Sequence, residues 1–202
     1  MSLEIIEKIR ERESLDLALE NALNKLKRAV KKRNDDLHLL SVVTVDDQNK
    51  PNTRNVVLRD FSIDNLTIRF HTDKRSSKIK DIKVNKSICL IGYDKKIKLQ
   101  IRIDADAYSI SDEETLLDIW KKMYPMSREC YRVSRSPGDK IESLNEVTFD
   151  KDDETNLIGF DNFAAIQCDI KTIEVLYLSH INHMRAKYNN INGILKGEWI
   201  IP

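Results

Sequence analysis

Short segments in which apolar and polar residues alternate, separated by turn-forming residues, run through most of this 202-residue chain. An alternation with a period of two is typical of β-strands that bury one face, and short connections join antiparallel neighbours. Seven or so strands linked mainly by hairpins predict an antiparallel β-barrel with helical covers, because a doubly wound parallel sheet would alternate strand and helix regularly. We expect strands at residues 37–45, 52–60, 66–72, 87–93, 97–110, 163–170 and 173–179, and a closing hairpin at 188–201.

Helical patterns lie before and between these segments. After Ser14, apolar residues recur at helical spacing, and Lys and Arg crowd the last turn, where they complement the helix dipole. The expected helices are residues 3 to about 33, a helix capped by Ser76 that runs through Asn85, a helix that opens with a capping box at 111–114 and stops at Pro125, and a further turn or two within 127–134.

The acidic and polar residues 145–161 are expected to form a surface loop. A chain of this length suits one domain, so we expect residues 1–202 to form a single unit. Residues 1–33 would be its N-terminal helical segment, and residues 37–202 would be a barrel with inserted helices.

The overall charge balance indicates no nucleic-acid or membrane partner. The chain has 34 basic and 33 acidic residues, a formal net charge of +1, so any attraction for an anion must be local. No apolar run is long enough to span a bilayer, and the N-terminus lacks the apolar core of a signal peptide. The three scattered cysteines, Cys89, Cys130 and Cys168, do not suggest a disulfide framework, and we expect a cytoplasmic protein.

Residues 54–78 provide such a local site. They are expected to form a strand, a tight turn, a second strand and a serine-rich start of a helix. Cationic residues bracket the stretch, with Arg54 and Arg59 near one end and Lys74, Arg75 and Lys78 at the other. If the strands fold back on each other, both groups of cations can approach one anionic ligand.

The helix start at Ser76, Ser77 and Lys78 suits a phosphate, because hydroxyls and free amide groups lie there beside a cation. Arg54 could add a bidentate contact to the same phosphate, and the backbone of its strand offers hydrogen bonds to a flat heteroaromatic ring. Taken singly, the serines could simply cap the helix, and Arg54 could be a solvated strand residue. Likewise Lys98, Gln100 and Arg102, on one face of a later strand, could simply meet water.

The order of four motifs resembles the flavin-binding signature of the pyridoxamine 5'-phosphate oxidase family. That family binds FMN with an arginine-rich strand, an aromatic-Tyr-Thr-Asn step, a Ser-Arg-Lys helix start and an Arg-Gln-Val strand. The matching segments here are Arg54–Arg59, Phe70–Asp73, Ser76–Lys78 and Leu99–Ile103. The ending Gly197–Pro202 is similar to the tryptophan and proline ending of the family.

The resemblance extends from about residue 37 to the C-terminus, and it implies a split β-barrel homodimer with two FMN molecules at the subunit interface. By position, Arg54 and Lys78 would hold the phosphate, and Ser76 and Ser77 would assist. The backbone of Val56–Leu58 would line the flavin ring.

The resemblance also places Arg59 near the polar edge of the ring, His71 and Thr72 in the family's Tyr-Thr position, and Gln100 within reach of the flavin, from the same or from the other subunit. The complete implied set of cofactor contacts is Arg54, Asn55, Val56, Val57, Leu58, Arg59, His71, Thr72, Ser76, Ser77, Lys78 and Gln100.

Several positions depart from the family pattern. Ser77 replaces an arginine, His71 a tyrosine and Arg59 a lysine. The Arg-x-His motif with which the oxidases contact substrate is absent, and Asn182–Arg185 is more similar to the His-Arg-Arg-type variant of a less characterised branch.

That branch is also similar to this chain around Trp120, Ser127–Arg128, Tyr131 and Pro137–Gly138. The resemblance implies substrate contacts from Arg128, His183 and Arg185, although the two arginines could also be surface residues. No side chain is an obvious general base, so we assign no catalytic residue. No metal site is expected, because no ligand cluster completes the His180 and His183 pair.

The expected function is that of an FMN-dependent oxidoreductase acting on a small anionic substrate. Two alternatives stay open. One is an FMN-dependent reductase that uses a nicotinamide donor, and the other is a non-catalytic flavin- or haem-binding module.

Overall fold

The computed structural model describes residues 3–150, 156–179 and 183–202. Its eight strands are β1 (Leu39–Val45), β2 (Pro51–Ser62), β3 (Thr67–Asp73), β4 (Ser87–Asp94), β5 (Leu99–Ser109), β6 (Phe163–Tyr177), β7 (Met184–Ile191) and β8 (Ile194–Ile200). They form one antiparallel sheet in the order β3-β2-β1-β4-β5-β6-β7-β8. Because β3 also pairs with β6, the first six strands of this order close into a barrel, and β7 and β8 extend from it. The predicted split barrel with helical covers is confirmed.

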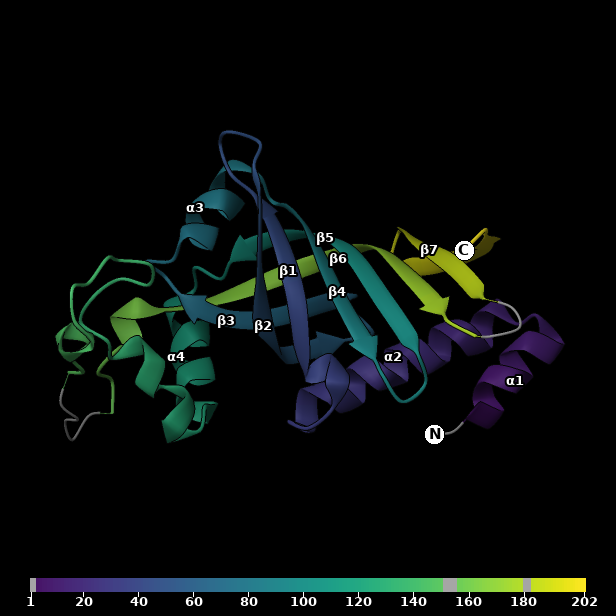
Figure 1. The fold of residues 1–202 in the computed structure, drawn as a ribbon, viewed down its shortest axis with the longest axis horizontal. Coiled ribbons are helices and arrows are strands. Elements are labelled where there is room, and N and C mark those ends of the chain that lie inside the picture. Colours follow the sequence, from purple (N-terminus) through teal and green to yellow (C-terminus); the bar gives the residue numbers. More distant parts are fainter. Residues whose placement is uncertain (1–2, 151–155, 180–182) are drawn as a thin grey trace.

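The α-helices are α1 (Leu3–Arg12), α2 (Leu15–Lys31), α3 (Ser77–Val84) and α4 (Glu113–Lys122). In Figure 1, α2 runs beneath the strands, α3 lies at the opposite rim of the barrel, and α4 lies far from α1 and the C-terminus. Short 3₁₀ turns complete the chain at Asp36–His38, Pro125–Ser127, Glu129–Tyr131, Leu144–Glu146 and Phe160–Asn162.

The barrel interior is filled by the alternate residues of its strands. In β2, Val56 and Leu58 are buried, whereas Asn55 is exposed and Val57 is half-buried. Helix α2 closes the barrel with its apolar side, on which every third or fourth residue is buried: Ala18, Ala22, Leu26 and Ala29. A smaller aromatic cluster packs α4 against the start of β6 and consists of Trp120, Tyr131, Phe160 and Phe163.

One buried ion pair fixes α2 to the barrel. Lys25 Nζ lies 2.5 Å from Asp94 Oδ2, and both side chains are almost inaccessible to solvent. One turn earlier on α2, the amide of Asn21 donates to the Tyr177 hydroxyl at 2.9 Å. Removing one partner of such a pair would leave a buried charge, so these contacts fix where the helix lies.

The single helix predicted for residues 3 to about 33 is wrong, because the structure has two helices. The backbone of Glu13 is left-handed with φ 46°, and Ser14 caps α2 by accepting a hydrogen bond from the Leu17 amide at 3.2 Å. Ser14 therefore starts a helix instead of lying inside one.

The two strands predicted at 163–170 and 173–179 are one continuous strand, β6. Its first half pairs with β3 and its second half with β7, while β5 runs along most of its length. At the predicted break, β6 continues, and the register of its pairing with β5 shifts between Asp104 and Ala105.

The capping box predicted at 111–114 also needs a correction. Asp112, one residue after Ser111, is the N-cap of α4 and accepts a hydrogen bond from the Thr115 amide at 2.8 Å. Within the predicted loop 145–161, Phe149 forms a bridge with Val133, and residues 151–155 lie outside the described part of the chain.

Candidate functional site

The start of α3 brings a lysine and two hydroxyl groups together. Lys78 Nζ donates to Thr72 Oγ1 at 2.7 Å and to Ser76 Oγ at 3.1 Å. Ser76 is the N-cap residue of α3, but its side chain makes no capping hydrogen bond. The first amides of the helix are therefore not satisfied by their own cap, which is the arrangement that favours an anion at a helix N-terminus.

Arg54 lies beside this lysine and is held by three groups. Its Nη1 donates to Thr44 Oγ1 at 2.5 Å and to the Asn52 carbonyl at 3.0 Å, and its Nη2 lies 3.5 Å from Asp81 Oδ2. Thr44 in turn donates to Asp81 Oδ2 at 2.6 Å. Thr44 and Asp81 fix the direction of the guanidinium group, and neither residue was predicted from the sequence.

The electrostatics of this cluster favour an anionic ligand. Burial lowers the pKa of Lys78, and the neighbouring Arg54 charge lowers it further. Within the described residues, Lys78 forms no salt bridge, although Arg54 is paired with Asp81. A phosphate placed between Arg54, Lys78 and the start of α3 would offset both effects. We call Arg54, Thr72, Ser76 and Lys78 the cationic cluster.

The other cations near this cluster are placed differently. Arg75 makes two hydrogen bonds to the Asp73 carboxylate, at 3.0 and 2.7 Å, and donates to the carbonyls of Val133 and Ser134. The Lys74 side chain is exposed. Arg75 therefore connects the loop before α3 to the segment after α4. Its guanidinium group is used in these contacts within the protein and not for a ligand.

The outer face of β2 leads away from the cationic cluster. Asn55, Val57 and Arg59 lie on this face, while Val56 and Leu58 point into the barrel. Side chains of the outward residues, together with the β2 backbone, could contact a flat ring laid along the strand. Val56 and Leu58 could contribute only their backbone groups.

His71 lies on the outer face of the neighbouring strand β3. Its ring packs edge-on against Phe163, with ring centroids 5.0 Å apart. Burial lowers the pKa of His71 to about 3, helped by the charges of Arg59 and Arg69. The imidazole is therefore neutral at physiological pH. The sequence analysis missed Arg69, although it shares the outward alternation of His71.

The structure does not bring Gln100 to the cationic cluster. Gln100 is near the start of β5, and two strands, β1 and β4, lie between β5 and β2 in the sheet. It is partly exposed on the outer face of the barrel. Within one chain, Gln100 is therefore not part of the cationic cluster.

The structure separates Arg128 from the other two expected substrate residues, His183 and Arg185, which lie together. Arg128 donates to the carbonyls of Lys121 and Met123, at 2.9 and 3.0 Å, and its guanidinium carbon lies 5.4 Å from the Trp120 ring centroid. It therefore terminates α4. His183 directly precedes β7 and Arg185 lies in it, and Figure 1 shows β7 beside the C-terminus, far from α4.

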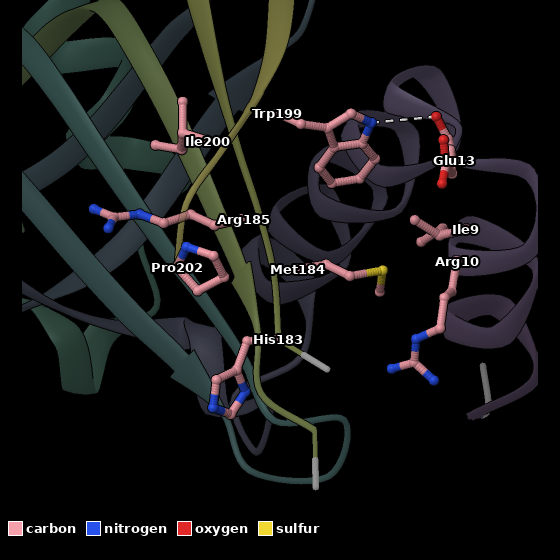
Figure 2. A pocket seen from close by; sticks show the side chains of 9 residues that line it. All are labelled: Ile9, Arg10, Glu13, His183, Met184, Arg185, Trp199, Ile200 and Pro202. Atoms are coloured by element: carbon pink, nitrogen blue, oxygen red, sulfur yellow. Dashed lines mark hydrogen bonds between the residues drawn. The ribbon is translucent and has the colours of Figure 1, made fainter. Parts of the chain in front are cut away.

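His183 and Arg185 line a pocket of about 390 Å³ between α1 and the β7–β8 hairpin, drawn in Figure 2. Arg185 is paired with Glu174 at 2.8 Å, and the Trp199 indole donates to the Glu13 carbonyl at 3.3 Å. His183 Nδ1 accepts a hydrogen bond from the Ser179 amide. Asn182 and His180, which the sequence analysis also considered, lie outside the described residues.

Two kinds of feature are absent from the described residues. No helix in this part of the chain is long and apolar enough to cross a membrane. No group of three or more His, Cys, Asp or Glu side chains in the described ranges is arranged to hold a metal ion.

Comparison with known proteins gives matches of two kinds. A family model, described as the FMN-binding domain of pyridoxamine 5'-phosphate oxidase, matches residues 19–111. A pyridoxine/pyridoxamine 5'-phosphate oxidase of Bdellovibrio bacteriovorus is 36% identical over 90 residues, which are 45% of this chain and 45% of that protein. The match therefore spans less than half the length of this curated relative.

Solved structures share the fold over nearly the whole chain. A pyridoxamine 5'-phosphate oxidase-related, FMN-binding protein of Nostoc punctiforme has a TM-score of 0.76 at 21% identity, over 90% of this chain and 96% of that one. PhzG of Burkholderia lata, in complex with tetrahydrophenazine-1-carboxylic acid, has a TM-score of 0.66 at 18% identity, over 91% and 90%.

At 21% and 18% sequence identity, these two structural matches show a shared fold only. The similarity of the His183–Arg185 segment to one branch of the family stays a prediction. The family model and the shared fold together confirm the resemblance, inferred from the sequence motifs, to the pyridoxamine 5'-phosphate oxidase-like family of FMN-binding split barrels.

Proposed function

We propose that this protein binds FMN and is an oxidoreductase that acts on a small anionic substrate. The observation that carries the proposal is the cationic cluster, in which Lys78 and Arg54 lie beside the start of α3 without a described carboxylate paired to the lysine. This donor set fits a phosphate monoester, because it combines two cations, hydroxyl groups and helix amides.

In this proposal, Arg54, Lys78, Ser76 and Ser77 hold the FMN phosphate, with Thr72 orienting the lysine. The ring lies along the outer face of β2, against the Val56–Leu58 backbone. Its contacts there come from the outward side chains Asn55, Val57 and Arg59, with His71 on the next strand.

When bound, FMN supplies the hydride-transfer chemistry, so the protein needs to provide binding, orientation and electrostatics. Arg59 provides a positive charge at the far end of β2 from the phosphate, where it stabilises negative charge on the ring. His183 and Arg185 orient the substrate from the C-terminal pocket, and Arg128 acts by holding the end of α4.

The active form is proposed to be a homodimer. Two strands, β1 and β4, lie between Gln100 and β2 within one chain, so its contact with the flavin comes from the partner chain. Figure 1 shows β7 and α4 at opposite ends of a single chain. The proposed dimer brings the C-terminal pocket beside β7 of one chain toward the α4 region of the other.

The test is to purify the protein and record its absorbance. A yellow protein that releases FMN, or that binds added FMN in a titration with one site per chain, supports the proposal. A colourless protein that does not bind added FMN contradicts it.

Anaerobic reduction then separates the three functional classes. Bleaching of the bound flavin by pyridoxamine 5'-phosphate would indicate an oxidase of the family type. Faster bleaching by a nicotinamide donor would indicate a reductase. A flavin that neither compound reduces would indicate a binding module.

A further inference from the structure

Thr44 is a buried polar residue on the interior-facing side of β1. It continues the alternation of Leu40 and Val42, which fill the barrel, and it is inaccessible to solvent. An apolar residue would satisfy the packing at this position, whereas a buried hydroxyl group costs free energy unless it is hydrogen-bonded. The partners of this hydroxyl group therefore indicate what the threonine does.

Both partners of the hydroxyl group are charged side chains. Thr44 Oγ1 donates to Asp81 Oδ2 at 2.6 Å and accepts from Arg54 Nη1 at 2.5 Å. A carboxylate only accepts and a guanidinium only donates, so the single hydroxyl hydrogen goes to Asp81 and a lone pair faces Arg54. Asp81 therefore fixes the orientation of the hydroxyl group, and the hydroxyl group in turn fixes Arg54.

Three elements meet at these contacts. Thr44 lies near the end of β1, and Arg54 lies across from Val42 on the neighbouring strand β2. Asp81 lies on α3, one turn after Lys78, and Figure 1 shows α3 beside β1 at the rim of the barrel. Thr44 and Asp81 are buried, whereas Arg54 is partly exposed. The guanidinium group is therefore held from its buried side.

The contacts of Arg54 leave one edge of its guanidinium group unused. Nη1 donates to Thr44 and to the Asn52 carbonyl, and Nη2 lies 3.5 Å from Asp81 Oδ2. Within the described residues Nε makes no hydrogen bond, and Nη2 carries a second hydrogen. Nε and Nη2 lie on the same edge of the planar group, and two parallel donors on one edge match two oxygens of a phosphate. Thr44 therefore holds the arginine through one nitrogen and leaves this edge for a ligand.

We propose that Thr44 is a positioning residue for the phosphate of the flavin, and that Asp81 fixes the hydroxyl group through which it acts. This inference rests on the proposed function. Thr44 acts through Arg54, whose Nε and Nη2 it directs toward the phosphate. Without the hydroxyl group, the guanidinium group can turn toward Asp81 and pair with it directly. It must then be reoriented before a phosphate binds, so the affinity falls.

The test is fluorescence titration of the full-length protein, freed of flavin, with FMN and with riboflavin, which lacks the phosphate. Thr44→Val removes the hydroxyl group and keeps the shape of the side chain. We expect it to raise the Kd for FMN by about fivefold or more, which corresponds to about 1 kcal/mol, the scale of one hydrogen bond. The Kd for riboflavin should stay within about twofold of the wild type. A residue that served only the fold would change both Kd values alike.

Two further variants separate the hydroxyl group from the packing. Thr44→Ser keeps the hydroxyl group and should bind FMN within about twofold of the wild type. Thr172→Val is the matched control, because the Thr172 hydroxyl also donates to an aspartate, Asp104, at 3.0 Å. Thr172 is on β6, which is separated from β1 by two strands in either direction around the barrel. This control should leave both Kd values unchanged.

A double variant gives a second readout that does not depend on riboflavin. If Thr44 acts through Arg54, adding Thr44→Val to Arg54→Ala should weaken FMN binding no further than Arg54→Ala alone. If Thr44→Val does not fold, Thr44→Ala replaces it with the same expectations, because alanine places no methyl group against the Asp81 carboxylate.

Three results would overturn the inference: unchanged FMN affinity in Thr44→Val, equal losses of FMN and riboflavin affinity, or additive losses in the double variant. Each of them leaves the proposed function intact, because the wild-type protein still binds FMN. A wild-type protein that binds no FMN would overturn the proposed function and this inference together.

Discussion

At the scale of single residues, the two cations of the cationic cluster differ in their surroundings. Arg54 is fixed by Thr44, Asn52 and Asp81, whereas the contacts of Lys78 among the described residues are to the hydroxyls of Thr72 and Ser76. The arginine is therefore already oriented before a ligand arrives, and such preorganisation lowers the cost of binding.

We expect Arg54→Ala to weaken FMN binding by roughly 1.5–3 kcal/mol, the scale of a charge-assisted hydrogen bond. This corresponds to an increase in Kd of about 10- to 150-fold, measurable by flavin fluorescence titration. Lys80→Ala, an exposed lysine on α3, is the matched control for the lost charge and should leave the Kd nearly unchanged. If the Arg54→Ala variant bound FMN with the wild-type Kd, Arg54 would not be part of the FMN site.

His71 gives the folded protein a dependence on pH. Burial first, and then the charges of Arg59 and Arg69, lower its pKa from 6.5 to about 3. Between these values the unfolded chain binds a proton that the folded protein does not, so this group's effect on stability becomes more unfavourable as the pH falls.

We therefore expect the free energy of unfolding of the wild type to fall between pH 7 and pH 5 by about 2 kcal/mol more than that of His71→Phe. Urea unfolding at the two pH values measures this difference. Parallel pH profiles for the two proteins would show that His71 is not held neutral by the fold.

At the scale of secondary structure elements, α4 faces the outer side of β3 across a cavity that His71 and Ile119 both line. The first turn of α4 depends on one side chain. Asp112 accepts the Thr115 amide at 2.8 Å, while the preceding Ser111 is exposed. We expect Asp112→Ala to lower the free energy of unfolding by about 1 kcal/mol, the usual cost of losing an N-cap, and Ser111→Ala to change it by much less. If denaturant titrations gave the same loss of unfolding free energy for both variants, Asp112 would not be the dominant N-cap of α4.

The elements themselves were largely predictable, because local alternation and turn residues determine them. The strands around residues 54–78 and the hairpin at Asn192 and Gly193 lie where the pattern indicates. The break at Glu13 was not visible, because Ser14 fits both a helix interior and a cap. The continuity of β6 depends on its pairing with β3, β5 and β7, which no local pattern records.

The candidate site was predictable to a smaller extent. The proximity of Arg54 and Lys78 follows from folding two adjacent strands back on each other, so the sequence could indicate it. Asp81 and Thr44 approach Arg54 from other elements, and α4 reaches Arg69 and His71 only through the closure of the barrel. These contacts depend on tertiary packing, which cannot be inferred from the local patterns of a single sequence.

At the scale of the whole molecule, the proposed homodimer requires an interface, and our candidate for it is the outer face of β1, β2 and β4. It carries the partly buried apolar residues Val43, Val57 and Ile91 and the exposed Leu39 and Tyr93. A twofold contact through this face would cover them, and it would bring a second Gln100 toward β2.

We expect the protein to sediment at twice its chain mass of 23.5 kDa. Ile91→Lys should produce a monomer, because a twofold interface would bury the new charge twice. It should also weaken FMN binding by removing the contact of the partner's Gln100. The control Ile194→Lys changes an exposed residue of β8 and should leave the dimer intact. A wild-type monomer that binds FMN fully would contradict the proposed assembly.

The length of β6 has a consequence for the integrity of the chain. Its residues Phe163–Asp169 seal the barrel against β3, whereas Thr172–Tyr177 carry the C-terminal hairpin. Truncation of the chain after Tyr177 would leave the barrel closed but would remove the hairpin from the second half of β6. The uncovered edge would present unpaired amides and carbonyls beside Val175 and Tyr177, which are buried in the intact chain. Such a fragment would be prone to self-association even though its barrel stayed folded.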